Sequence, residues 1–518
     1  MSERTTEYSP RLYNEDLAPA ESRNWGTYSL FAMWMSDIHS VGGYMFAAGL
    51  FALGLSALGV FSALTVGIIA VFFLMNLSGY AGQKMGVPYP VLSRISFGTL
   101  GANVPAIIRA LVAIFWYAVQ TFFASEAVVI LALKIWPSLE SATTTQILGL
   151  HPLGWFAYLL MWAVQLLLLR NGMETIRRFQ DWAGPAVWVV MFALTIYILA
   201  KANWHVSLTL PGTDAKFGMA HAWLAAFATT VAYFAALLLN FCDFARFAPS
   251  KKSVFTANMW GLPVNFIAFT VVSVLVTAGT KEIYGEYISD PVKVVGRIDN
   301  TFALLLGALT FAIATLGINV VANFVSPAYD LANVAPGKID FKKGGLISAI
   351  IALFLFPWMF AGSDSSFQKF IIMLGAFLGP LFGVIMMDYF KLRKQQVVVP
   401  DLYHEQGHYS YGGRGWNPKA MTAALCGVVP AILVTQLPAF AIIADFAWFL
   451  GAGIAAVVYF VIAKNDPYVL DAIRAAADYE ARTDLEIDRS ARDEVALDQG
   501  SAGNPDPQMP GAAPGSDK

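Results

Sequence analysis

Long apolar runs alternate with short polar stretches along most of this chain. Each run has 18 residues or more and carries few charges, and a helix of that length crosses the roughly 30 Å hydrocarbon layer of a membrane. The runs lie at residues 27–53, 58–82, 103–134, 153–170, 181–200, 221–241, 254–280, 299–328, 344–361, 367–390, 419–437 and 443–463. The pattern predicts an all-α polytopic membrane protein with twelve transmembrane helices.

Polar segments flank this predicted membrane domain, residues 27–463. Residues 1–26 hold no apolar core of a signal peptide, so we expect a cytoplasmic N-terminal segment and an insertion signal in the first helix. Residues 464–518 end in a stretch rich in Pro, Gly and charged residues, which predicts a cytoplasmic, largely disordered tail.

The composition agrees with a membrane protein and argues against several functions. Of the 518 residues, 57% are hydrophobic and 13% are charged, whereas soluble domains carry about 25% charged residues. The two cysteines give no disulfide framework, and the six histidines form no metal-binding or catalytic motif. We find no phosphate-binding loop. Besides the lipid bilayer, we expect no nucleic acid, no obligate protein partner, no cofactor and no enzyme activity.

The distribution of basic residues predicts the orientation of the chain in the membrane. Cytoplasmic loops carry an excess of Lys and Arg, and most loop Lys and Arg residues here follow even-numbered helices. The loops after odd-numbered helices hold Lys134, Lys201, Lys216, Lys281, Lys293 and Arg297. We therefore expect both termini in the cytoplasm and the cytoplasmic (inner) membrane as the location.

Two of the predicted helices show signs of interruption. The first contains Asp37-Ile-His-Ser-Val-Gly-Gly43, and the sixth passes Thr229-Thr230-Val-Ala-Tyr233-Phe234 with a weaker signal. A glycine inside a helix costs about 1 kcal/mol against alanine. The glycine pair marks either a close packing face or a discontinuous helix whose free backbone groups line a cavity. Matching breaks in helices one and six would indicate two inverted five-helix repeats.

Polar side chains recur at equivalent positions of two such repeats, at about 27–200 and 221–390. The third helix carries Trp116 and Gln120, and the eighth carries Asn319 and Asn323. The members of each pair are four residues apart and share a helix face. The two faces could hold a planar, amide-bearing ring by stacking and paired hydrogen bonds. Alternatively, these groups only join helices, at about 0.6–2 kcal/mol per contact.

Ionisable groups inside the apolar runs are further candidates, because charges at membrane depth are costly and usually face a cavity or a partner. Asp37 and His39 lie beside the glycine pair, and Glu126 lies towards the outer end of the third helix. Asp37 is the strongest candidate for a coupling group. His39 and Glu126 are alternatives.

Three other charged residues are expected to have structural roles. Arg109 should reach the membrane surface with its charged head while its apolar stem stays in the membrane. Asp243 and Arg246 should pair locally at the cytoplasmic end of the sixth helix.

Several segments, in their order along roughly residues 12–465, resemble the nucleobase–cation symporter-1 family, which includes transporters of hydantoins, allantoin, uracil and cytosine. Bacterial allantoin and hydantoin permeases resemble the chain most. The segments are Tyr13-Asn-Glu-Asp-Leu-Ala-Pro19, Arg23-Asn-Trp25, Tyr89-Pro-Val-Leu-Ser-Arg-Ile-Ser-Phe-Gly98, Phe115-Trp-Tyr-Ala-Val-Gln120, Asn240-Phe-Cys-Asp-Phe-Ala-Arg-Phe247, Asn319-Val-Val-Ala-Asn-Phe-Val-Ser-Pro-Ala-Tyr329, Leu378-Gly-Pro-Leu-Phe-Gly383 and Asp388-Tyr-Phe390.

The resemblance implies a LeuT-type fold, with ten helices in two inverted repeats and two peripheral helices at about 419–463. Trp116 then corresponds to an aromatic that stacks on the substrate, and Gln120 to an amide donor. Asn323 corresponds to the carboxamide that pairs with the amide edge of the ring, with Asn319 one turn away. Phe234 stands where the family's hydantoin carrier has a tryptophan, so the stacking face is kept without an indole N–H.

The resemblance also implies a weakened sodium site. The family's site uses two hydroxyl side chains of the eighth helix, where this chain has Gly317 and Ile318. A hard cation needs oxygen ligands, and only backbone carbonyls near Ser36, His39 and Ala314 would remain.

The sequence therefore predicts a secondary transporter that imports a nucleobase or related cyclic ureide across the cytoplasmic membrane by alternating access. We expect proton coupling through Asp37, with His39 as the alternative titrating group. Sodium coupling with the same substrates is one alternative, and an integral membrane enzyme or receptor is the alternative from another class. The sequence leaves the ring open among uracil, cytosine, allantoin and hydantoins.

Overall fold

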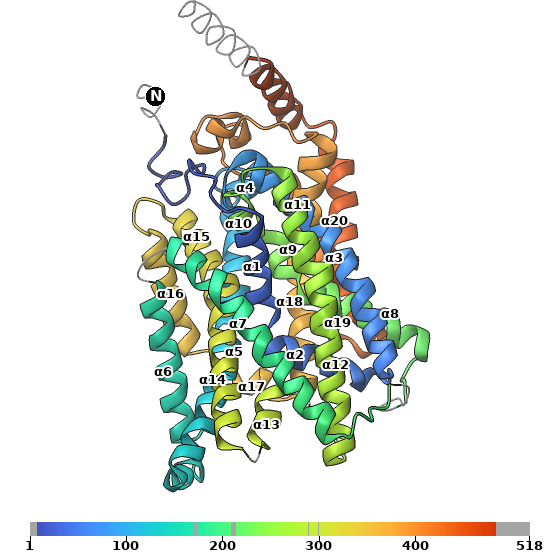
Figure 1. Ribbon diagram of the computed structural model, residues 1–518. Helices are drawn as coiled ribbons and strands as arrows, with labels where there is room; N and C mark the ends of the chain where they lie inside the picture. Colours follow the sequence, from blue (N-terminus) through green and yellow to red (C-terminus); the bar gives the residue numbers. More distant parts are fainter. Residues whose placement is uncertain (1–7, 170–172, 209–213, 289, 299, 483–518) are drawn as a thin grey trace, which may run out of the picture.

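The computed structural model describes residues 8–169, 173–208, 214–288, 290–298 and 300–482. Most of these residues belong to helices, and the described part of the chain contains one isolated β-bridge, between Ile147 and Leu150, and no strand. The long helices run side by side in a bundle, as Figure 1 shows. The predicted all-α class is confirmed.

The helices differ widely in length. In the described residues the α-helices are α1 (Thr27–Ile38), α2 (Val41–Gly49), α3 (Ala57–Met85), α4 (Tyr89–Phe97), α5 (Asn103–Ile135), α6 (Pro152–Leu169), α7 (Met173–Lys201), α8 (Met219–Tyr233), α9 (Ala235–Asn240), α10 (Cys242–Ala245), α11 (Lys251–Met259), α12 (Asn265–Tyr284), α13 (Pro291–Gly296), α14 (Thr301–Ile318), α15 (Val325–Val334), α16 (Phe341–Leu353), α17 (Trp358–Ala361), α18 (Asp364–Met386), α19 (Pro418–Gln436) and α20 (Ala447–Ala463). Wider π-helical turns, η3 (Trp260–Val264), η4 (Asn319–Phe324) and η5 (Met387–Leu392), continue α11, α14 and α18.

Eight segments of the described chain are long and apolar enough to cross a membrane as single helices. They are Ala57–Met85, Asn103–Ile135, Arg177–Lys201, Lys251–Tyr284, Leu304–Val334, Ser365–Leu392, Pro418–Gln436 and Ala444–Ala463. The other four helices expected from the sequence are interrupted or short. The first is divided into α1 and α2, the sixth into α8 and α9, and the fourth and ninth correspond to the shorter α6 and α16.

The first interruption lies at His39 and Ser40, between α1 and α2. Ser40 has an extended backbone (φ −106°, ψ 159°), and its Oγ accepts a hydrogen bond from Gly43 N at 3.0 Å. This N-cap satisfies one of the free amides at the start of α2. A Cβ at Gly43 would lie only 2.7 Å from Ile38 O. The glycine pair therefore belongs to a discontinuous helix, as the sharper of the two interpretations predicts.

The second interruption lies at Phe234, between α8 and α9. This one residue leaves the helical conformation (φ −86°, ψ 1°), and Leu238 N then donates to Phe234 O at 2.9 Å as helical bonding resumes. Helix α8 packs closely on α3, because a Cβ at Gly67 would lie 2.7 Å from the side chain of Thr230. Interruptions are thus present in both helices in which the sequence indicates them.

Asn319 and Asn323 lie in the π-helical turn η4, between α14 and α15. A π-helical turn is wider than an α-helical one and is frequent at functional sites. On its outer side, Phe324 packs so closely on α16 that a Cβ at Gly345 would lie 2.1 Å from its ring. The wide turn is therefore held between α16 and the rest of the bundle.

The N-terminal segment, residues 8–26, runs across one end of the helical bundle, at the top of Figure 1. Asn14 Nδ2 donates to Pro336 O and to Ile339 O, each at 3.2 Å. Trp25 N donates to Phe247 O at 3.1 Å. These bonds attach the segment to the loop after α15 and to the end of α10.

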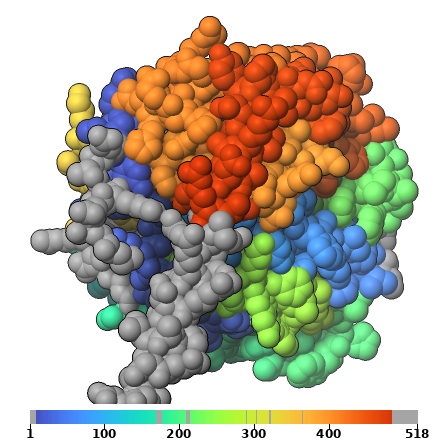
Figure 2. Space-filling view, turned by 90° about the horizontal axis from the view of Figure 1, so that it is seen from above, coloured from blue at the N-terminus to red at the C-terminus, as the bar shows by residue number. Residues whose placement is uncertain are grey.

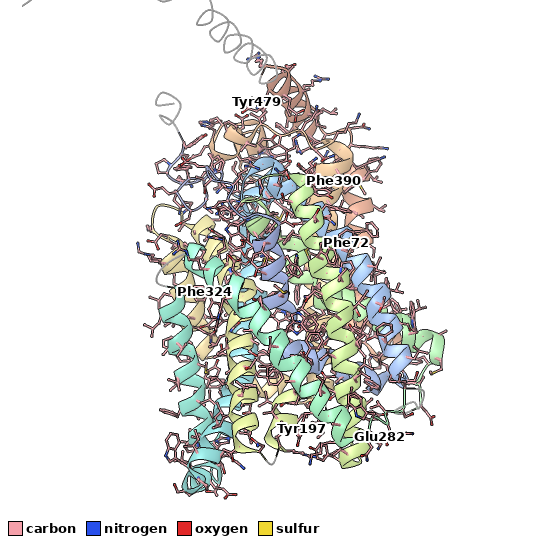
Figure 3. The ribbon with its side chains drawn as sticks, viewed as in Figure 1. Phe72, Tyr197, Glu282, Phe324, Phe390 and Tyr479 are labelled. Atoms are coloured by element: carbon pink, nitrogen blue, oxygen red, sulfur yellow. The ribbon has the colours of Figure 1, made fainter. Side chains whose placement is uncertain are left out.

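The start of the expected tail, 464–518, packs on the same end of the bundle. Residues 467–482 are helical and bury Val469, Ala472 and Ala476. Tyr479 marks this end in Figure 3, and Glu282 marks the opposite end. Seen from above, the orange and red C-terminal part of the chain occupies one side of this end (Figure 2). The tail is therefore helical and packed in its first part, and residues 483–518 lie outside the described residues.

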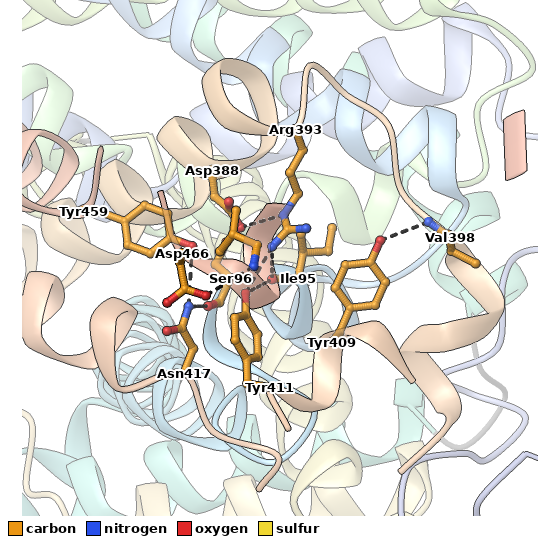
Figure 4. A network of polar contacts seen from close by, with 11 residues as sticks. Ile95, Ser96, Asp388, Arg393, Val398, Tyr409, Tyr411, Asn417, Tyr459 and Asp466 are labelled. Atoms are coloured by element: carbon orange, nitrogen blue, oxygen red, sulfur yellow. Dashed lines mark hydrogen bonds and ion pairs between the residues drawn. The ribbon is translucent and has the colours of Figure 1, made fainter. Parts of the chain in front are cut away.

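Figure 4 shows a network of polar contacts around a buried ion pair. Arg393 Nε lies 3.0 Å from Asp388 Oδ2, and both side chains are fully buried. Arg393 Nη2 also donates to Ile95 O at 3.2 Å and to Tyr411 Oη at 3.1 Å. The network joins α4, η5 and the segment that leads to α19.

The expectation for Arg109 is wrong. The side chain does not reach the membrane surface but is fully buried. Its Nη2 donates to Asn240 Oδ1 at 3.0 Å and to Ala322 O at 3.2 Å. A buried guanidinium is tolerated because these acceptors replace water.

Asp243 and Arg246 attract each other electrostatically, as expected, but the hydrogen bonds of the two side chains go elsewhere. Asp243 Oδ1 accepts a hydrogen bond from Tyr89 N at 2.7 Å, at the start of α4. Arg246 donates instead to the backbone oxygens of Asp16 and Ala18, at 3.4 and 3.3 Å. The two residues thus join α10 to separate segments.

Candidate functional site

A small cavity lies where the two interrupted helices meet α5 and η4. Its walls are formed by Asp37, Trp116, Gln120, Tyr233, Phe234, Ala236, Leu237, Ile318, Ala322 and Asn323. Its volume is about 30 Å³. The structure thus brings together four of the five residues expected to bind substrate, with Asp37 and Ile318, from four separate parts of the chain.

Aromatic rings form one part of the cavity wall. Trp116 of α5 stands nearly perpendicular to Tyr233, with ring centroids 5.7 Å apart and an interplanar angle of 86°. Tyr233 in turn meets Phe234 at 5.3 Å and 82°, and stacks on Phe46 of α2 at 4.4 Å and 13°. A flat ligand among such rings can stack on one face and meet another edge-on.

Tyr233 is absent from the residues that the sequence marked. The signal that would have identified it is its place directly before Phe234, in a helix already suspected of a break. Its side chain is held between Phe46 of α2 and Trp116 of α5, so it links both interruptions to the cavity.

Gln120 provides a carboxamide near the first interruption. Its side chain is 1% exposed, and Nε2 donates to Ser40 Oγ at 3.3 Å. Its Oε1 is buried and has no hydrogen-bond partner among the described residues. A Cβ at Gly42 would lie 3.0 Å from Gln120 Nε2, so the glycine allows the amide to approach the break.

Asn323 provides a second carboxamide, and Asn319 lies behind it rather than on the cavity wall. Asn323 Nδ2 donates to Asn319 Oδ1 at 3.0 Å. Asn319 Nδ2 donates to Tyr117 O at 3.0 Å and to Gln165 Oε1 at 2.6 Å. Gln165 of α6 is fully buried. In the sequence this residue is only a lone amide in an apolar run.

Asp37 is the acidic side chain among the residues that line the cavity. It lies near the C-terminal end of α1 and is 4% exposed. Its Oδ1 is buried without a hydrogen-bond partner in the part of the chain that the structure describes. Such an oxygen is costly to bury unless a proton or a cation meets it.

His39 and Glu126 lie away from the cavity. The ring of His39 packs edge-on against Trp188, with centroids 4.3 Å apart, and its Nδ1 lies 3.3 Å from Tyr44 Oη. Glu126 lies on α5 within electrostatic reach of Lys293 in α13. Of the three ionisable candidates, the structure therefore places Asp37 at the cavity.

The sequence pattern of the family described as "Permease for cytosine/purines, uracil, thiamine, allantoin" matches residues 18–458. The chain belongs to this permease family. The permease is 38% identical over 464 residues to the allantoin permease of Bacillus subtilis (strain 168), covering 89% of this chain and 94% of that protein. It is 30% identical over 478 residues to the purine-uracil permease NCS1 of Arabidopsis thaliana, covering 88% and 78%. Members of this family are transporters and not enzymes.

Solved structures show which fold the permease has. Mhp1, a nucleobase-cation-symport-1 family transporter in a closed conformation with bromovinylhydantoin bound, matches with a TM-score of 0.73 at 23% identity, covering 90% of this chain and 100% of that chain. MhsT in complex with L-phenylalanine matches with a TM-score of 0.55 at 14% identity, covering 84% and 100%. The permease is therefore a multi-pass membrane protein with the LeuT-type fold.

Two of the residues expected at a sodium site, Ser36 and Gly317, lie side by side in this permease. A Cβ at Gly317 would lie 3.9 Å from Ser36 Cβ, so α1 and α14 touch at this point. Ser36 Oγ is buried without a hydrogen-bond partner among the described residues. Ala314 offers no side-chain oxygen, and Ile318 lines the central cavity with an alkyl group. The side chains thus fit a sodium ion poorly.

Proposed function

We propose that this permease imports a planar, amide-bearing ring, either a nucleobase or a cyclic ureide, by alternating access through the central cavity. The observation that carries the proposal is the meeting of aromatic faces, Trp116 and Phe234, with two carboxamides, Gln120 and Asn323, between interrupted helices. Substrate sites at mid-membrane, built from discontinuous helices, recur in secondary transporters. The aromatic faces would hold the ring and the carboxamides would bind its edge.

The small size of the cavity supports a site whose walls move apart when substrate binds. About 30 Å³ is far less than a ring needs, so the walls must separate before a ring enters. The interrupted helices are suited to this movement because few backbone hydrogen bonds cross a break. A ligand that binds the open arrangement more tightly would shift the population towards it.

Ureides are the favoured class of substrate. The relative with 38% identity is an allantoin permease, and the resemblance found in the sequence also includes hydantoin carriers. Phe234 offers such a ring a purely apolar face. Uracil is the next candidate, because a relative with 30% identity is a purine-uracil permease.

The membrane topology we propose has twelve spans and two inverted repeats. The first repeat would run from α1 to α7 and the second from α8 to η5, with α19 and α20 at the periphery. An even number of spans agrees with the position of both described chain ends at one end of the bundle (Figure 1). The excess of Lys and Arg in the loops at that end favours cytoplasmic termini.

We assign the coupling ion as a proton carried by Asp37. The support is the unpaired, buried Oδ1 of this residue at the cavity wall and the poor set of oxygens at the sodium position. Sodium coupling is the second candidate, favoured by the buried and unpaired Ser36 Oγ beside Gly317.

Uptake by purified permease in proteoliposomes tests the proposal. Labelled allantoin, hydantoin, uracil and cytosine are offered separately, with an imposed pH gradient or an imposed sodium gradient. We expect saturable uptake of at least one ureide, driven by the pH gradient. Strong stimulation by sodium without a pH effect would replace the proton by sodium. The absence of saturable uptake of every ring would overturn the transport proposal.

A further inference from the structure

The hydrogen bonds behind Asn323 fix the direction in which its carboxamide points. We infer that Asn319 is a positioning residue that holds the Asn323 oxygen towards the cavity, so that the site selects rings with an N–H donor beside a carbonyl. This inference rests on the proposed function and specifies which edge of the ring the site accepts.

The orientation of these carboxamides is set first at Gln165, on α6. Its Nε2 donates to Met161 O at 3.0 Å and to Thr121 Oγ1 at 3.1 Å. A backbone carbonyl only accepts hydrogen bonds, so the NH₂ group of Gln165 must face Met161. The Oε1 of Gln165 is thereby turned towards Asn319.

Two hydrogen-bond acceptors fix the orientation of the Asn319 carboxamide. Its Nδ2 lies 2.6 Å from Gln165 Oε1 and 3.0 Å from Tyr117 O, both of which are acceptors in this arrangement. The NH₂ group of Asn319 must therefore face α5 and α6. Its Oδ1 is left to accept from Asn323 Nδ2 at 3.0 Å.

Asn323 is the last residue in the chain of hydrogen bonds Gln165–Asn319–Asn323, which we call the relay. One of its N–H groups is used by Asn319, and its Oδ1 makes no hydrogen bond within the described part of the chain. Gln165, Asn319 and Asn323 are 0%, 1% and 5% exposed. Reversing the Asn323 amide would place its oxygen against Asn319 Oδ1, acceptor against acceptor. Asn323 thus offers the cavity a fixed acceptor and one remaining N–H donor.

Gln120 differs from Asn323 in this respect. Its Nε2 meets the hydroxyl of Ser40 at 3.3 Å, and a hydroxyl can either donate or accept. The Gln120 amide can therefore turn over to suit its ligand. Asn323, whose amide cannot turn over, is therefore the residue that distinguishes a ring edge with N–H beside C=O from the reversed edge.

The expected ligand is a ring with a lactam edge, in which an N–H lies beside a C=O. Uracil and hydantoin have this edge. Cytosine reverses it at one side of the ring and isocytosine at the other, because an amino group replaces a carbonyl and a lone pair replaces an N–H. A ring with the reversed edge, held by the aromatic wall in the same pose as uracil, would face Asn323 with acceptor against acceptor and donor against donor.

The test is displacement of labelled hydantoin from the purified full-length permease by uracil, cytosine and isocytosine. The readout is the affinity ratio between uracil and the weaker of the two reversed rings. The wild type should show a ratio of about tenfold or more, as expected for one mismatched pair of buried hydrogen bonds. In Asn319→Leu this ratio should fall close to one, because Asn323 can then turn over.

Two further variants separate positioning from folding. Asn319→Asp keeps an acceptor for Asn323 Nδ2 and should keep the wild-type ratio even if all affinities fall. Asn76→Leu removes another buried carboxamide, which donates to Phe72 O at 2.8 Å away from the cavity, and should leave the ratio unchanged. Asn319→Ala replaces the Leu variant if that variant does not purify.

The outcomes separate a failure of the positioning role from a failure of the proposed function. A wild-type ratio that persists in Asn319→Leu, or is lost equally in Asn319→Asp, would overturn the positioning role and leave the proposed function standing. A wild type that prefers cytosine or isocytosine over uracil would overturn the assigned direction of the amide. A wild type that binds none of the rings would overturn the proposed function, and the relay with it.

Discussion

The break between α1 and α2 is polar, whereas the break between α8 and α9 is aromatic. At the first, Ser40 caps the new helix and Asp37 lies at the cavity with an unpaired oxygen. At the second, Tyr233 and Phe234 turn their rings into the same cavity, and the backbone departs from a helix at one residue. Two interrupted helices thus supply different chemistry to one site.

The difference suggests a division of roles. A charge at membrane depth requires a partner, so the polar break is suited to an ion and to the edge of a ring. Aromatic faces offer stacking without strong direction, so the second break is suited to holding the plane of the ring. Variants at the two breaks should therefore fail in different ways.

The largest effect is expected from Asp37→Asn. The carboxamide has nearly the same shape but cannot carry a proton, so the variant should still bind and exchange substrate while losing concentrative uptake. Uptake against a gradient and exchange of preloaded substrate are measured in the same proteoliposomes. Glu126→Gln is the matched control, because that carboxyl lies away from the cavity. An Asp37→Asn variant that still concentrates substrate would remove Asp37 from ion coupling.

The glycine pair provides a second, smaller test of the polar break. Gly43→Ala places a methyl group 2.7 Å from the backbone oxygen of Ile38, and overpacking of this kind costs about 1–3 kcal/mol. We expect uptake to fall roughly tenfold or more. Gly42→Ala meets only the end of the Gln120 side chain, at 3.0 Å, and should cost less. Equal activity of the two variants would show that the break tolerates displacement.

At the aromatic break, Phe234→Ala should weaken the binding of all rings about tenfold, since an aromatic pair contributes roughly 0.5–1.5 kcal/mol beyond the area it buries. Phe234→Trp should keep or improve the binding of larger ureides. Both variants should leave the dependence on the pH gradient unchanged. Binding titrations with hydantoin and allantoin measure the effect. An Ala variant with wild-type affinity would show that Phe234 does not contact the ring.

The smallest effect is expected from Ser40→Ala. The change removes the N-cap of α2, which contributes about 1 kcal/mol, and a hydrogen-bond partner of Gln120. We expect a loss of about fivefold in affinity and a slightly lower melting temperature. A variant that loses all uptake would indicate that Ser40 binds the ion or the ring directly.

The sequence predicted the polar break better than the aromatic one for a physical reason. Polar residues and a glycine pair are conspicuous in an apolar helix, so Asp37 to Gly43 stood out. Phe234 interrupts its helix without Gly or Pro nearby, so the local sequence carries only a weak signal of the break. Tyr233 is indicated in the sequence only by its place beside Phe234, and Gln165 only by a lone amide, because the roles of both depend on neighbours from other helices.

The wrong expectation for Arg109 has the same origin. Arg109 is a reasonable candidate for snorkelling when only its own helix is considered. It is buried because Asn240 and Ala322 O, from distant parts of the chain, provide acceptors. The helical start of the tail is held by contacts of Val469 and Ala472 with the bundle, which the local composition does not reveal.

The central claim is that a ring binds between the two breaks, and binding of labelled hydantoin to purified Asn323→Ala tests it most directly. Trp116→Ala is measured beside it, with Asn76→Ala as the control for loss of a buried side chain. The account predicts that both cavity variants fold and purify but bind at least tenfold more weakly, while the control binds as the wild type does. Wild-type affinity in both Asn323→Ala and Trp116→Ala would contradict the account and place the ring elsewhere.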